Sequence, residues 1–165
     1  LEDGAAVGGN MDEKIPRNEF LCTEKMYENF ELRLKAKMQG KGDNAGIQFR
    51  SRRIPDHHEV IGYQCDMGSD AGGPIWGFIY DESRRNKYLT TPDREAALKV
   101  LDVDGWNDFL VRAEGNHIQI WLNGHKTVDY IEEDDTAYRS GVICLQIHSG
   151  PPSEAWYKDI ELVEL

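Results

Sequence analysis

Apolar and polar residues alternate along most of the chain with a period of two. Residues 28–38 read "ENFELRLKAKM", in which every second side chain is apolar and charged side chains lie between. This alternation is typical of a half-buried strand with one face on a core and one in water. Similar runs follow, and the Asn-Gly pair at 123–124 is a hairpin signal. Only residues 92–101 favour a helix, with Thr91 or Asp93 near its cap.

Three of the short strands share one polar pattern. The runs "IQFRS", "YQCDM" and "LQIHS" each place a glutamine and a second polar residue between apolar neighbours. Because side chains alternate across a strand, we predict that the apolar residues pack inward. The second polar residues, Arg50, Asp66 and His148, then face away from the core. They form one site only if the fold brings these strands together.

Many short strands joined by turns predict a single all-β domain over residues 1–165. We expect an antiparallel β-sandwich with at most one short helix. The Gly-rich residues 1–18 are expected to be partly peripheral.

The charge composition limits the classes of partner that we expect for this chain. The chain carries 30 acidic and 19 basic residues, a net charge of -11, which disfavours nucleic acid or anionic lipid as the main partner. No stretch approaches the roughly 20 apolar residues of a membrane span. The three cysteines, Cys22, Cys65 and Cys144, lie in apolar runs without a CxxC motif, so we expect buried free thiols.

Six segments, taken in order, resemble the 3-keto-disaccharide hydrolase family. They cover nearly the whole chain and read "NEFLCTEKMYENFELRLKAKM", "NAGIQFRS", "HHEVIGYQCDMG", "GFIYDESRR", "GWNDFLVRAEGNHIQIWLNG" and "GVICLQIHSG...YKDIELVEL". The resemblance implies a concanavalin A-like jelly-roll sandwich and a periplasmic or secreted location. It also implies that a first strand usual in the family is missing ahead of residue 1.

The family name implies a sugar substrate already oxidised at C3. A ketone there acidifies the hydrogen on C2, so a base can remove it and the glycosidic group leaves by β-elimination. Water addition completes a net hydrolysis. This chemistry needs a base, a stabiliser for the enolate oxygen and assistance to the leaving group, and it does not require the carboxylate pair of an ordinary glycosidase.

The sequence supplies candidates for each role. His58 and His148 are candidate bases, because imidazole titrates near neutrality. Arg50 is a permanently charged donor for an oxyanion, and Asp66 is the fourth catalytic candidate. Side chains that can bind sugar hydroxyls or stack on a ring form a larger set: Gln48, Gln64, Trp76, Tyr80, Glu82, Arg84 and Gln146.

Purely structural roles for the same residues remain as alternatives. Arg50 can be half of a surface salt bridge, and His148 can make a satisfied structural hydrogen bond. No cofactor is required, although a divalent cation is an alternative, with Glu59 and Asp66 as candidate ligands. Adjacent histidines in a strand point opposite ways, so at most one histidine of "DHHE" enters a given site.

Two rival functions remain at this stage. One is a non-catalytic carbohydrate-binding module of the same fold, which needs aromatic and amide side chains but no charged Arg, His and Asp set. The other is a two-carboxylate glycosidase, which is disfavoured because no strand carries an evident ladder of carboxylates.

Overall fold

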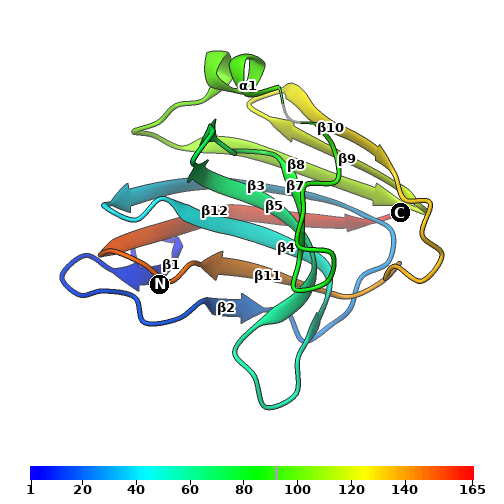
Figure 1. Ribbon diagram of the computed structural model, residues 1–165, viewed down its shortest axis with the longest axis horizontal. Helices are drawn as coiled ribbons and strands as arrows, with labels where there is room; N and C mark the ends of the chain where they lie inside the picture. The colour runs from blue at the N-terminus through cyan, green and yellow to red at the C-terminus, as the bar shows by residue number, and fades with distance from the viewer. Residues whose placement is uncertain (92) are drawn as a thin grey trace.

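The computed structural model describes residues 1–91 and 93–165, which form two antiparallel sheets packed face to face (Figure 1). The first sheet, called here the β3 sheet, has the order β1-β12-β3-β8-β9-β10. Its strands are β1 (Ala6–Asn10), β12 (Ser153–Glu164), β3 (Phe30–Gly40), β8 (Asn107–Glu114), β9 (His117–Leu122) and β10 (His125–Ile131).

The second sheet, called here the β4 sheet, has the order β2-β11-β4-β5-β6, and β7 also pairs with β5. Its strands are β2 (Glu19–Cys22), β11 (Val142–Ile147), β4 (Asn44–Arg53), β5 (Val60–Asp70), β6 (Gly73–Pro74) and β7 (Ile79–Glu82). The predicted all-β antiparallel sandwich is therefore confirmed.

The core lies between the two sheets and follows the predicted alternation. Ile47 and Phe49 of β4 and Tyr63 and Cys65 of β5 are fully buried on the inner side of the β4 sheet. Phe49 stacks on Tyr63, with ring centroids 5.6 Å apart. The intervening side chains of these strands consequently face outward, away from the core.

The two long edges of the sandwich differ. Helix α1 (Arg94–Val100) contacts β6 and β10 and so bridges the two sheets at one edge, at the top of Figure 1. Its predicted cap is confirmed, because Asp93 accepts a hydrogen bond from the Ala96 amide at 3.0 Å. No helix in the described part of the chain is long and apolar enough to cross a membrane.

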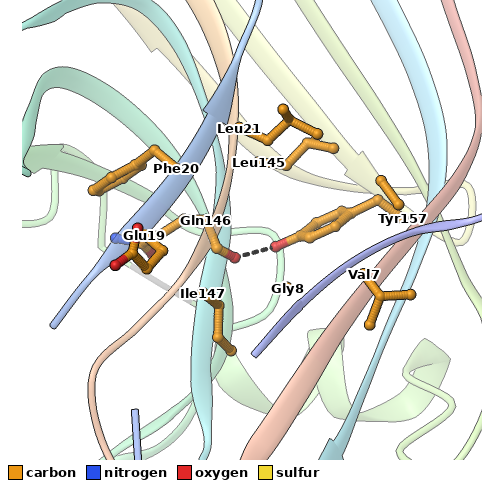
Figure 2. A pocket seen from close by; sticks show the side chains of 10 residues that line it. Val7, Gly8, Glu19, Phe20, Leu21, Leu145, Gln146, Ile147 and Tyr157 are labelled. Atoms are coloured by element: carbon orange, nitrogen blue, oxygen red, sulfur yellow. Dashed lines mark hydrogen bonds between the residues drawn. The ribbon is translucent and has the colours of Figure 1, made fainter. Parts of the chain in front are cut away.

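The opposite edge, between β1 and β2, holds an apolar slot of about 230 Å³ (Figure 2). Leu145 and Ile147 line it from the core side of β11. At its base, the Tyr157 hydroxyl donates to the Gln146 carbonyl at 2.5 Å, which ties β12 to β11 across the core.

The expectation of three free thiols is wrong for two of them. Strand β2 pairs with β11 in a register that sets Cys22 opposite Cys144, and the two form a disulfide. The sequence did not predict this pairing, because 122 residues separate the two cysteines. Cys65 remains a free, buried thiol, as predicted.

Candidate functional site

The outer side of the β4 sheet carries a group of polar side chains that we call the polar face: Gln48, Gln64, Asp66, Tyr80, Glu82 and Gln146. Strand register places them on one surface. Gln64 of β5 lies opposite both Gln48 of β4 and Tyr80 of β7. Gly46 of β4 lies opposite both Asp66 and Gln146, so these two flank a position without a side chain.

Gly46 shapes the polar face by leaving room above β4. A Cβ atom at this position would lie 2.7 Å from the Gln64 side chain, so only glycine allows that side chain to fold across β4. Gln64 then donates to Asp66 Oδ1 at 2.8 Å and accepts from Gln48 Nε2 at 3.2 Å. The two amides therefore hold the Asp66 carboxyl in a fixed orientation.

Asp66 is the most perturbed carboxyl of the polar face. Burial raises its pKa well above the usual value, and the nearby negative charges of Glu82 and Asp70 raise it further. The hydrogen bond from Gln64 opposes this shift. The protonated form of Asp66, which can donate a hydrogen bond, is therefore favoured over its level in a free aspartate.

A second carboxyl lies at the rim of the same face. Burial raises the pKa of Glu82, and the charge of Glu59 adds to the effect, whereas His148 lowers it. Asn18 ties this rim together, because it donates to Glu59 Oε1 at 3.0 Å and accepts from the Ser149 amide at 2.8 Å. Glu59 and His148 therefore act on the pKa of Glu82 in opposite directions.

The histidines at the rim have defined hydrogen bonds. His148 Nδ1 lies 2.7 Å from the Ser149 carbonyl oxygen, which can only accept. Nδ1 therefore carries the proton in the neutral ring, and Nε2 keeps its lone pair for use as a base. His58 Nε2 lies 3.2 Å from Glu59 Oε1, and its ring stacks on His57.

Several buried polar atoms around the polar face lack a hydrogen-bond partner among the described residues. They are Asn44 Oδ1, Gln48 Oε1, Glu59 Oε2, Gln146 Oε1 and Gln146 Nε2. Gln48 and Gln146 are 0% and 1% exposed. A buried polar atom left unpaired costs about 1–3 kcal/mol, so these atoms are sites for hydrogen bonds to ordered water or to a polar ligand.

The prediction that Arg50 shares this face is wrong. The register of β4 against β5 shifts between Phe49 and Arg52, and Arg50 has a φ of 47°, so a bulge turns its side chain away. The guanidinium is fully buried and donates to the carbonyls of Glu28 and Gly115, at 2.8 and 2.7 Å. The salt-bridge reading is wrong as well, because these acceptors are backbone carbonyls.

Two predicted sugar-binding residues also lie elsewhere. Trp76 belongs to the core, where its ring stacks on Phe109 with centroids 6.1 Å apart. Arg84 pairs with the buried Asp81 and lies over the Tyr63 ring at 4.8 Å, on the inner side of β5. Both residues lie in turns on either side of β7, where strand alternation does not set the direction of a side chain.

Sequence reasoning missed two residues, Asn18 and Asn44. Asn18 sits in a loop before β2, and its contacts with residues 59 and 149 depend on tertiary folding. Asn44 is the first residue of β4 and continues the outward alternation of Gly46 and Gln48, so strand phase could have found it.

The candidate cation ligands, Glu59 and Asp66, are not joined by a third ligand. Across residues 1–91 and 93–165, no group of three or more His, Cys, Asp or Glu side chains is arranged to hold a metal ion.

Comparison with known families gives one match that spans the chain. The model of the 3-keto-alpha-glucoside-1,2-lyase-like domain matches residues 1–163. The chain belongs to this family. The resemblance inferred from the sequence is therefore confirmed, and the 3-keto-alpha-glucoside-1,2-lyase-like domain is carbohydrate-active, with a hydrolase-like or carbohydrate-binding function. No curated protein matches the chain.

Solved structures support the fold of this lyase-like domain. A candidate glycosyl hydrolase from Parabacteroides distasonis ATCC 8503 superimposes with a TM-score of 0.70 at 20% identity, covering 100% of this chain and 82% of that one. A carbohydrate-binding module, CBM66 of Bacillus subtilis, gives a TM-score of 0.60 at 14% identity, covering 96% and 94%. At such identities these likenesses establish the sandwich fold alone.

Proposed function

We propose that this domain cleaves 3-keto-glucosides by removing the C2 proton and eliminating the glycosidic group, with or without later addition of water. The observation that carries this proposal is the set of unpartnered buried polar atoms beside Asp66, whose pKa is raised. Amide groups and carboxyls of this kind suit the hydroxyls of a sugar ring, and a protonated carboxyl suits its ketone oxygen.

His148 Nε2 takes the C2 proton in this scheme, since its Nδ1 is already engaged. The electron pair of the broken C2–H bond moves toward the C3 carbonyl, and the resulting enolate oxygen accepts hydrogen bonds from protonated Asp66 and from Gln146 Nε2. The pair then forms the C1–C2 double bond as the C1–O bond breaks. The Tyr80 hydroxyl supplies a proton to the leaving oxygen.

A protonated carboxyl can take the place of a cation in stabilising the enolate oxygen. A raised pKa that keeps a carboxyl neutral at pH 7 is a known way to build an oxyanion donor. Glu82 lies close enough to His148 for each charge to affect the other, and it stabilises the imidazolium that forms after proton transfer. Arg50 has no part in this scheme.

The location proposed for the protein is periplasmic or secreted. The Cys22–Cys144 disulfide supports this proposal, because disulfides persist in oxidising compartments and are rare in the cytosol.

One assay tests the proposed activity. The protein is incubated with a 3-keto-glucoside that bears a chromogenic leaving group and, in parallel, with the unoxidised glucoside, each with and without chelator. We expect release from the oxidised substrate only. Substituting His148→Ala should lower turnover by roughly 10²–10⁴-fold. His125→Ala, at the start of β10, is the matched control.

Each other outcome has a definite meaning. Release only from the unoxidised glucoside refutes elimination and favours an ordinary glycosidase. Binding without release from either substrate favours a carbohydrate-binding module, which is the alternative function. Loss of release in chelator assigns a divalent cation to the polar face, with Glu59 and Asp66 as its first ligands.

A further inference from the structure

Two glutamines of the polar face point outward from the β4 sheet and are nevertheless closed off from solvent. Gln48 of β4 and Gln146 of β11 lie on neighbouring strands, and they are 0% and 1% exposed. The outer face of an antiparallel sheet is exposed to water unless another part of the chain covers it. Some other segment must therefore lie over these two side chains.

The hairpin tip between β4 and β5, residues 54–59, is the segment that bends toward them, and we call it the flap. Val60 follows the flap directly and pairs with Arg53 at the end of β4. In a straight strand, Arg53 would lie ~16 Å along β4 from Gln48. The Gln48 side chain nevertheless donates from Nε2 to the Val60 carbonyl at 3.3 Å. The end of the hairpin therefore folds back over the outer face of the sheet.

Two backbone features account for this bend. The ladder of β4 against β5 shifts register between Phe49 and Arg52, and a bulge of this kind bends its strand. On the facing strand, Gly62 has a φ of 151°, and a Cβ atom there would lie 2.3 Å from Ser51 Oγ. A residue with a side chain at this position would therefore push the two strands apart at the bend.

Asn18, in the loop before β2, joins the flap to the end of β11. Its side chain is buried, and its amide nitrogen donates to Glu59 Oε1 at 3.0 Å. Its amide oxygen accepts from the Ser149 backbone amide at 2.8 Å. His148 belongs to the same end of β11, and its Nδ1 is bound to the Ser149 carbonyl. Asn18 consequently fixes the flap and the candidate base relative to each other.

The Glu59 carboxylate depends on this contact. Among the described residues, its hydrogen-bond and ion-pair partners are Asn18 and His58, and of these Asn18 alone lies outside the flap. Its second oxygen, Oε2, is buried without a hydrogen-bond partner in the same part of the chain. The charge of Glu59 also raises the pKa of Glu82 on β7, so the carboxylate lies within electrostatic reach of the opposite side of the face.

We propose that Asn18 is a positioning residue that holds the flap closed over the polar face, and that the flap opens to admit a ligand to Gln48 and Gln146. The Asn18–Glu59 hydrogen bond breaks in this step, whereas the bond from Ser149 to Asn18 stays intact on the β11 side. The inference rests on the proposed function only in taking the ligand to be a 3-keto-glucoside.

Hydrogen exchange measured by nuclear magnetic resonance tests the flap without any sugar. The side-chain amide protons of Gln48 and Gln146 report its opening, and the backbone amide of the core residue Cys65 reports unfolding. Asn18→Asp keeps an acceptor for the Ser149 amide but replaces the donor to Glu59 by a second carboxylate. We expect both side-chain amides to exchange about 10–100-fold faster, with the Cys65 amide unchanged.

A reciprocal exchange of the two side chains checks that the bond itself matters. Adding Glu59→Gln to Asn18→Asp restores one amide and one carboxylate, with donor and acceptor exchanged and the total charge of the wild type. We expect exchange to return to within about threefold of the wild-type rate. Asn10→Asp, exposed at the end of β1, is the control with the same added charge and should leave the rates unchanged.

The outcomes separate the flap from the proposed activity. Equal exchange in the wild type and Asn18→Asp overturns the role of Asn18, and so does faster exchange that Glu59→Gln does not reverse. Wild-type exchange as fast as that of a free glutamine amide shows that no flap covers the face. A parallel rise at Cys65 assigns the effect to unfolding and refutes the proposal. Because no substrate is used, the release assay can fail while the flap is supported, and the reverse can also occur.

Discussion

Substitution of Arg50 separates a structural role from a catalytic one. Arg50→Met keeps much of the side-chain volume but removes three hydrogen bonds, to the Glu28 and Gly115 carbonyls and to Asn29 Oδ1. The two carbonyls then stay buried without this donor, at ~1–3 kcal/mol each. We expect a loss of ~2–6 kcal/mol in the free energy of unfolding, out of the ~5–15 kcal/mol typical of a domain.

The lower part of this range applies if losing the buried charge offsets some of the cost. Urea unfolding followed by tryptophan fluorescence measures the change. Arg53→Met, at an exposed position of the same strand, is the control and should change stability by less than ~0.5 kcal/mol. The folded fraction of Arg50→Met should cleave a 3-keto-glucoside at the wild-type rate. Wild-type stability combined with a hundredfold loss of turnover would refute the structural assignment and return Arg50 to the chemistry.

Three further changes test other parts of the molecule. Burial alone would raise the pKa of Glu132, but hydrogen bonds from Arg85 and other donors lower it to about 2. The stability of the wild-type protein should therefore fall as the pH drops from about 4.5 to 2. Glu132→Gln should flatten that part of a pH series of melting temperatures, and an unchanged slope would contradict the assignment. If protonated Asp66 donates a hydrogen bond to the enolate oxygen, turnover should fall as the pH rises through the raised pKa of Asp66. Asp66→Asn should not show this fall at high pH and should be roughly 10²–10³-fold slower than the wild type. Under oxidising conditions, Cys22→Ser should lower the free energy of unfolding by about 2–5 kcal/mol, because it removes the disulfide. If the same loss persists when the wild-type protein and the variant are both reduced, the effect does not come from the disulfide.

Strand phase explains which parts of the site the sequence predicted. Gln48, Gln64, Asp66 and Gln146 were found because the period of two continues unbroken through their segments. Arg50 was misplaced because a single bulge resets that period, and no turn residue marks it in "IQFRS". The disulfide and the Asn18 contacts depend on which distant strands become neighbours, which local alternation does not specify.

The loss of Arg50 from the site changes the electrostatics of the proposed reaction. None of the side chains that we assign to the polar face is permanently cationic, although Asp70, which acts on Asp66 together with Glu82, is itself paired with Arg94 at 2.9 Å. Together with burial, the charges of Glu82 and Asp70 raise the pKa of Asp66. Burial is the larger cause and the neighbouring negative charges add to it, so both favour the protonated carboxyl, which can donate a hydrogen bond. An added arginine would bring a donor but would also lower the pKa of Asp66, so the arrangement favours one neutral donor over a charged pair.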